Sequence, residues 1–128
     1  MGIIIMKIEK SCLIFIGDAT SEDSIATARE LAYKQPEYCL AEYATRHCKV
    51  TLDAPRMTIW QAAEQGIHAF VIGHQSHNNE LDVKWLPTLI EALEAGMDII
   101  YPKSQKIPQF SKIKYHALCL GRRIIALH

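Results

Sequence analysis

The stretch Cys12-Leu13-Ile14-Phe15-Ile16-Gly17-Asp18-Ala19-Thr20 decides the fold class. Residues 12–17 carry no charge, Gly17-Asp18 interrupts the apolar run, and a helical pattern follows directly. An uninterrupted apolar strand that leads into a helix is typical of a parallel sheet covered by helices on both faces. Open α/β sheets bind ligands at the carboxyl ends of their strands. The turn after Gly17 is therefore the predicted beginning of a ligand-binding edge.

The same alternation of strand and helix continues along the chain. We predict strands at 12–16, 38–43, 68–73, 98–101 and 122–127, and helices at 21–34, 58–66, 83–95 and 108–120. Alternation of this kind implies right-handed crossovers and a parallel sheet. The predicted fold is α/β, a three-layer α/β/α sandwich of the Rossmann-like or flavodoxin-like kind with about five strands. For the order of the strands we predict 3-2-1-4-5.

Three local signals set expected helix starts. Thr20 with Asp23, and Thr58 with Gln61, have the spacing of a capping box. Pro87 is unfavourable in a helix interior, so the third long helix is expected to begin close to it.

A chain of 128 residues fits a single domain. We assign residues 11–128 to the Rossmann-like domain and residues 1–10 to an N-terminal arm or extra strand. The run Ile3-Ile4-Ile5 is too apolar to be left exposed, which favours an edge strand or a contact between copies. We expect a homo-oligomer that uses this arm or a helix face.

Composition excludes several classes of partner. The chain has 14 basic and 14 acidic residues, whereas nucleic-acid and anionic-membrane surfaces need a basic excess. No stretch approaches the ~20 apolar residues of a membrane span, and no signal peptide is recognisable. The four cysteines have no C-x-x-C or zinc-finger spacing, so we expect reduced thiols and a cytoplasmic protein.

Polar residues follow three of the predicted strands, where a small-molecule ligand is expected. The predicted ligand-binding residues are Asp18, Thr20 and Ser21 after the first strand, Gly73, His74, Ser76, His77 and Asn78 after the third, and Lys103 and Ser104 after the fourth. Lys103 is either a partner for a substrate carboxylate or an ordinary solvated lysine. The connection 44–57 is unusually polar for its length, which favours a functional loop.

Cofactor and metal sites are less favoured. A dinucleotide fingerprint needs three glycines and only Gly17 is present, while Asp18 would repel phosphate, so an NAD-dependent enzyme is a weaker hypothesis. His74, His77 and Asp82 have ligand chemistry but no assured additional ligand, so we expect no metal. His47 and Cys48 are adjacent and would point apart on an extended chain. We expect no cofactor in this chain.

The order of several motifs resembles a known family. The motifs are Leu13-Ile14-Phe15-Ile16-Gly17-Asp18, Gln35-Pro36-Glu37-Tyr38-Cys39, Phe70-Val71-Ile72-Gly73, Glu91-Ala92-Leu93-Glu94-Ala95-Gly96-Met97-Asp98 and Gly121-Arg122. Over about residues 11–128 the chain resembles the N-terminal domain of domain-of-unknown-function family 1611. Members of that family include D-glutamate (D-amino-acid) N-acetyltransferases.

The resemblance implies a Rossmann-like domain that contributes an amino-acid-like small-molecule site to an N-acetyltransferase. It also implies a C-terminal P-loop-type domain, absent from this sequence, that binds acetyl-CoA or a nucleotide. Two segments depart from the family pattern: residues 76–79 replace a glycine pair, and Pro102-Lys103-Ser104 replaces Gly-Leu-His. We expect the isolated chain to be catalytically silent. The alternative is a stand-alone, non-catalytic module for ligand binding or oligomerisation.

Overall fold

The computed structural model describes residues 10–75 and 78–127. Most of the predicted N-terminal arm, together with Ser76 and His77, lies outside the described residues. The elements in chain order are β1 (Cys12–Gly17), η1 (Glu22–Ile25), α1 (Ala26–Lys34), β2 (Cys39–Ala44), α2 (Ile59–Glu64), β3 (Ala69–Ile72), η2 (Val83–Trp85), α3 (Leu86–Glu94), β4 (Asp98–Pro102), α4 (Phe110–Cys119) and β5 (Ile124–Leu127). This alternation confirms the predicted α/β class.

The five strands form one parallel sheet in the order β2-β1-β3-β4-β5. The predicted order 3-2-1-4-5 is wrong, because β3 pairs with β1 and β2 is an edge strand. Burial explains the observed order. Every residue of β3 is buried, as an internal strand requires, whereas β2 exposes Leu40 and leaves Tyr43 and Ala44 only partly buried.

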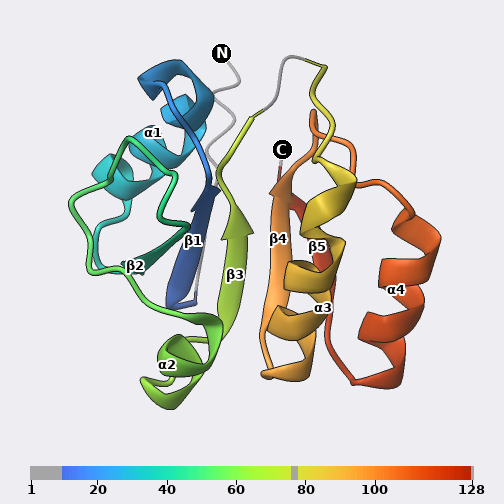
Figure 1. Ribbon diagram of the computed structural model, residues 1–128. Coiled ribbons are helices and arrows are strands. Elements are labelled where there is room, and N and C mark those ends of the chain that lie inside the picture. Colours follow the sequence, from blue (N-terminus) through green and yellow to red (C-terminus); the bar gives the residue numbers. More distant parts are fainter. Residues whose placement is uncertain (1–9, 76–77, 128) are drawn as a thin grey trace, which may run out of the picture.

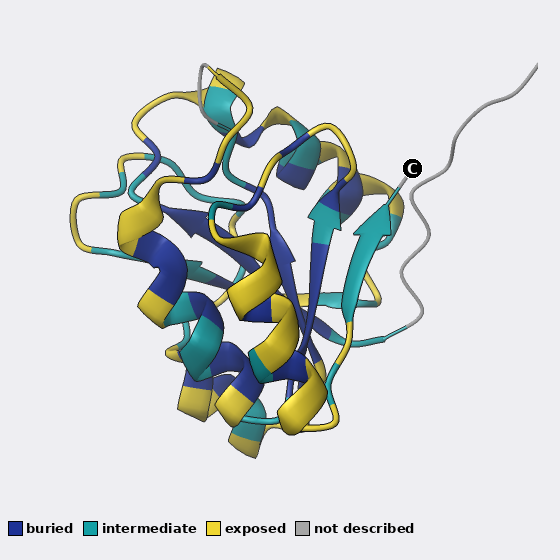
Figure 2. Ribbon diagram, turned by 90° about the vertical axis from the view of Figure 1, so that its right-hand side faces the viewer, coloured by how far each residue is buried: buried dark blue, intermediate teal, exposed yellow. Residues whose placement is uncertain are grey.

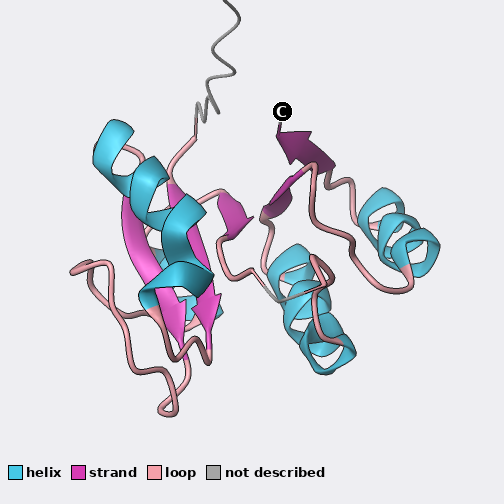
Figure 3. Ribbon diagram, turned by 90° about the horizontal axis from the view of Figure 1, so that it is seen from above, coloured by secondary structure: helices cyan, strands magenta, loops and turns pink. Residues whose placement is uncertain are grey.

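Helices cover both faces of the sheet, unequally (Figures 1 and 3). Alternate residues of β1 enter different cores. Leu13 and Phe15 pack with α2, α3 and α4 on one face. Ile14 and Ile16 pack with α1 on the other. Figure 2 shows buried strands lying behind helices whose outer surfaces are exposed. The three-layer Rossmann-like architecture is therefore confirmed.

Two of the three helix-start predictions hold. The side chain of Thr58 accepts from the Gln61 N–H, and Gln61 reciprocates in a complete capping box. Pro87 occupies the first turn of α3, where its missing N–H leaves no bond unmade. The capping box of Thr20 and Asp23 is wrong, because a short 3₁₀ turn capped by Ser21, without a side-chain hydrogen bond, precedes α1.

The helix pattern of residues 108–120 also predicts that Phe110, Ile113, Ala117 and Leu120 face inward. Ile113 and Ala117 are buried as expected. Phe110, the first residue of α4, and Leu120, its C-cap, are exposed, so the prediction is wrong at both ends of the helix. Within the described residues, no helix has the length and apolar character needed to cross a membrane.

Candidate functional site

Two glycines allow the carboxyl edge of the sheet to form. Gly17 has a positive φ of 59°, and a Cβ there would lie 2.8 Å from Phe15 Cζ and 3.1 Å from Trp85. A Cβ on Gly73 would lie 2.6 Å from the Cβ of Ala28. Glycine is therefore required for α1 and the start of α3 to approach the ends of β1 and β3.

Two hollows meet at this edge and share Asp18 and His74. The larger, of about 510 Å³, is lined by Asp18, Thr20, Ser21, Asp23, Ser24, His74, Gln75 and Asn79. The smaller, of about 120 Å³, is lined by Asp18, His74, Glu80, Leu81, Asp82, Lys84, Trp85 and Gln105. The larger hollow has the volume of a typical small-molecule site. Both lie beyond β1 and β3, where the chain leaves the first strand toward one face and the third toward the other.

An ion pair joins the turn after β1 to η2, the 3₁₀ turn before α3. Lys84 Nζ lies 2.7 Å from Asp18 Oδ2 and 5.3 Å from the centre of the Trp85 ring. The hydrogen bond from Lys84 lowers the pKa of Asp18 below its usual value, and the same bond raises the pKa of Lys84. Asp18 keeps 30% of its side chain exposed, so the carboxylate remains accessible from the hollows.

His74 forms part of the wall of both hollows. Its ring lies 6.5 Å from that of Phe15, and its carbonyl oxygen accepts a 2.9 Å hydrogen bond from Gln105 Nε2. Burial lowers the pKa of His74, and the nearby Asp18 carboxylate only partly opposes this effect. At neutral pH His74 is therefore an uncharged imidazole that can donate or accept a hydrogen bond.

The loops after β3 and β4 are joined by the backbone as well. Lys106 N–H donates to the carbonyl of Asn79, and Leu81 N–H donates to the carbonyl of Lys106. Gln75 N–H donates to the carbonyl of Ser24, which attaches the β3 exit to the turn before α1. Three segments that are distant in sequence thus form one rim.

The structure brings together four of the predicted ligand-binding residues. Asp18, Thr20, Ser21 and His74 line the larger hollow. Gly73 is buried beneath them, and its N–H donates to the carbonyl of Phe15.

Three other predicted residues lie outside the two hollows. Asn78 is exposed, and its Oδ1 accepts from the N–H of Glu80. Lys103 and Ser104 are exposed on the turn after β4, and neither lines either hollow.

Sequence reasoning missed the residues that complete the walls. Lys84 and Trp85 come from η2, the 3₁₀ turn before α3, and Gln105 comes just after the predicted Lys103 and Ser104. Only the position of Gln105 at a strand exit signalled its role. Lys84 carried no such signal, since it precedes a helix and pairs with a residue 66 positions away.

Among residues 10–75 and 78–127, no three His, Cys, Asp or Glu side chains form a group suited to a metal ion. His77, considered above as a metal ligand and as a ligand-binding residue, lies outside the described residues. All four cysteines are free thiols, and the Cys48 thiol donates to the carbonyl of Val50.

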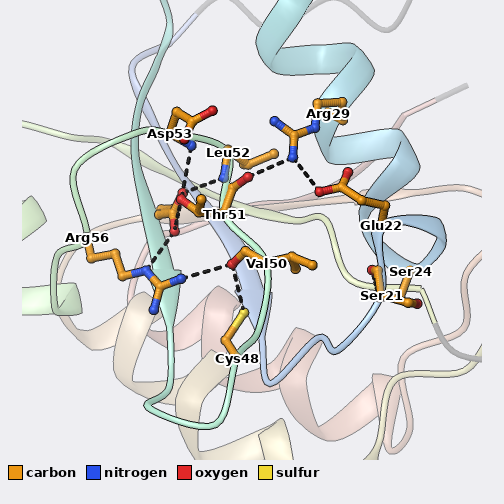
Figure 4. Close-up of polar contacts among 11 residues, drawn as sticks. Ser21, Glu22, Ser24, Arg29, Cys48, Val50, Thr51, Leu52, Asp53 and Arg56 are labelled. Atoms are coloured by element: carbon orange, nitrogen blue, oxygen red, sulfur yellow. Dashed lines mark hydrogen bonds and ion pairs between the residues drawn. The ribbon is translucent and has the colours of Figure 1, made fainter.

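Residues of the polar connection between β2 and α2 form hydrogen bonds mainly with one another and with Glu42 of β2 (Figure 4). The fully buried Glu42 accepts hydrogen bonds from Thr51 Oγ1, the Leu52 N–H and Arg56 Nε. Arg29 of α1 donates to the carbonyl of Thr51 and to Glu22. The polar density that favoured a functional loop therefore anchors this segment to β2 and α1.

Comparison with known proteins bears on these features. Residues 40–125 match the family described as "Domain of unknown function (DUF1611_N) Rossmann-like domain". The chain belongs to this family. A protein from Pseudoalteromonas sp named D-glutamate N-acetyltransferase is 37% identical over 108 residues, which are 84% of this chain and 32% of that protein.

A protein from Tritonibacter scottomollicae with the same name is 27% identical over 92 residues, which are 72% of this chain and 28% of that protein. The chain thus spans about a third of the length of the curated relatives that it matches. The resemblance noted in the sequence is confirmed, and this is the Rossmann-like domain of a family whose relatives are named D-glutamate N-acetyltransferase.

Proposed function

We propose that this DUF1611_N domain contributes the binding site for an amino-acid-like substrate to an N-acetyltransferase. The substrate occupies the larger hollow between Asp18, Ser21 and His74 at the carboxyl edge of the sheet. The observation that carries the proposal is the meeting of both hollows at Asp18, which is paired with Lys84. The names of the two relatives supply the reaction class.

The charges of the site support an amino acid in particular. An α-amino acid carries an ammonium and a carboxylate a few atoms apart. Asp18 and Lys84 offer the matching carboxylate and ammonium side by side, and each can exchange its present partner for a substrate group of opposite charge. Both side chains are partly exposed, so breaking their ion pair to bind a substrate costs little desolvation free energy.

Acetyl transfer needs a second component. The described hollows offer no glycine-rich phosphate cradle, and Asp18 is repulsive to phosphate. We propose that a P-loop-type domain elsewhere in the complete protein binds the acyl-CoA or nucleotide, and that the Rossmann-like domain alone has no turnover.

Two further features concern location and self-association. The free cysteines support a cytoplasmic location. Exposed Tyr115 and Leu118 on α4 support self-association through a helix face.

The test is a thermal-shift measurement on the chain with D-glutamate, acetyl-CoA and NAD as separate ligands. We expect D-glutamate to raise the melting temperature, and an Asp18→Asn variant to lose most of that shift. Acetyl-CoA is expected to give none. Protection by NAD alone would overturn the proposal, and a chain that no ligand protects would favour a non-catalytic interaction module.

A further inference from the structure

One buried polar atom at the site has no partner. Among the side-chain nitrogens and oxygens of residues 10–75 and 78–127, Gln105 Oε1 alone is buried without a hydrogen bond. Gln105 is only 3% exposed. Buried amide groups in folded proteins are nearly always paired, and Gln105 lines the smaller hollow, so its unpaired oxygen is a candidate acceptor for a ligand group there.

The hydrogen bond of the Gln105 side-chain nitrogen determines the orientation of the amide. Its nitrogen donates to the His74 carbonyl at 2.9 Å. A flipped amide would place two acceptor oxygens together, so the nitrogen must stay where it is and the oxygen must be the free group. The Gln105 N–H is also bonded, to the carbonyl of Pro102, which holds the start of the side chain in place.

The smaller hollow that Gln105 lines is rich in acceptors. Three carboxylates line it, those of Asp18, Glu80 and Asp82, against the single ammonium of Lys84. His74 is neutral there because burial lowers its pKa. A hollow of about 120 Å³ with this balance has room for a small donor group rather than for a whole amino acid. An amino group carries positive charge and several N–H donors, which suits these acceptors.

We propose that Gln105 Oε1 accepts a hydrogen bond from the amino group of the substrate, which makes Gln105 the residue that selects amines over their deaminated counterparts. The amino group enters the smaller hollow while the remainder of the substrate lies in the larger one, and Asp18 at their junction neutralises its charge. This inference rests on the proposed function, because it assigns the amino end of the same substrate site.

The discriminating probe is a pair of ligands that differ only in that group. D-glutamate and glutarate share both carboxylates, and glutarate lacks the amino group. Titration calorimetry on the full chain should give D-glutamate a dissociation constant at least about tenfold lower, which corresponds to about 1.4 kcal/mol. In Gln105→Met, which keeps the length of the side chain and removes the acceptor, the two constants should approach each other. Gln65→Met, an exposed position at the end of α2, is the control and should retain the difference.

A second measurement on the unaltered chain keeps the inference testable if Gln105→Met does not fold. The Gln105 side-chain NH₂ signals in a ¹⁵N–¹H spectrum should shift with D-glutamate and stay in place with glutarate. Equal affinities for the two ligands, or a preference that survives in Gln105→Met, would overturn the inference while leaving the site intact. So would unmoved NH₂ signals, since water would then be the partner of Gln105. Absence of any D-glutamate binding would instead overturn the proposed function, and the inference with it.

Discussion

Two carboxylates on neighbouring strands show how the same chemistry serves different purposes. Glu42 of β2 is completely buried and is surrounded by Thr51, Leu52 and Arg56 from its own connection. Asp18, at the exit of β1, keeps 30% of its side chain exposed and has one flexible lysine as its partner. A carboxylate whose oxygens accept several hydrogen bonds from the protein stabilises the fold. A carboxylate with exposed oxygens at a hollow can bind a ligand.

The largest expected effect tests this contrast through stability. Glu42→Ala leaves Arg56 and two further donors without an acceptor, so we expect the free energy of unfolding to fall by about 3 kcal/mol. Asp18→Ala removes only an exposed ion pair and should change it by less than about 1 kcal/mol. Urea denaturation measures both. Equal losses in the two variants would remove the distinction between a structural and a ligand-binding carboxylate.

A second prediction separates packing from binding within the edge itself. In Gly73→Ala the new methyl group meets Ala28 and Ile14, at 2.6 and 2.9 Å, so we expect a loss of about 2 kcal/mol. Thr20→Ala, at an exposed position on the same edge, should change stability by less than about 0.5 kcal/mol. Urea denaturation of the pair is again the measurement. A harmless Gly73→Ala would mean that α1 does not approach β3 as closely as described.

The sequence predicts the fold class better than the arrangement of its strands. The uninterrupted apolar run of residues 12–17 predicted a parallel sheet, and the alternation of elements predicted the layers. The order of the strands depends on which strand pairs with β1, and the apolar pattern of β1 is the same for either neighbour. The charge of Glu42 in β2 was the available signal that β2 lies at an edge.

The candidate site likewise contains some residues that the sequence predicts and others that it does not. Asp18, Thr20, Ser21 and His74 were predictable because strand exits in a parallel sheet meet at one edge. Lys84 and Gln105 were not, since their partners lie 66 and 31 residues away and only the folded chain brings them together. The only sequence signal for Gln105 is its position just after β4, and its importance comes from burial and an unpaired oxygen.

The smallest expected effect concerns pH. Burial places the pKa of His74 below its ordinary 6.5, so the folded protein resists a proton that the unfolded chain accepts. The contribution of neutral His74 to the free energy of unfolding is complete above pH 6.5. It declines as the pH falls from 6.5 toward the lowered pKa of His74. Asp18 has a lowered pKa too, so its contribution persists above 3.8 and is lost only in stronger acid.

Urea denaturation at a series of pH values checks the His74 effect. A His74→Asn variant, which has no titrating ring, should show a shallower decline as the pH falls below 6.5 than the unaltered chain. An identical slope in the two proteins would show that His74 titrates as it does in water.

The most direct test of the ligand-binding edge is a ¹⁵N–¹H chemical-shift map of the chain titrated with D-glutamate. We predict that the largest backbone shifts fall on Asp18, Ser21 and His74, and that the segment from Val50 to Arg56, which Glu42 anchors, stays unchanged. Shifts concentrated in that segment or on the outer face of α4, or no shifts at all, would contradict the assignment of the substrate to the carboxyl edge of β1 and β3.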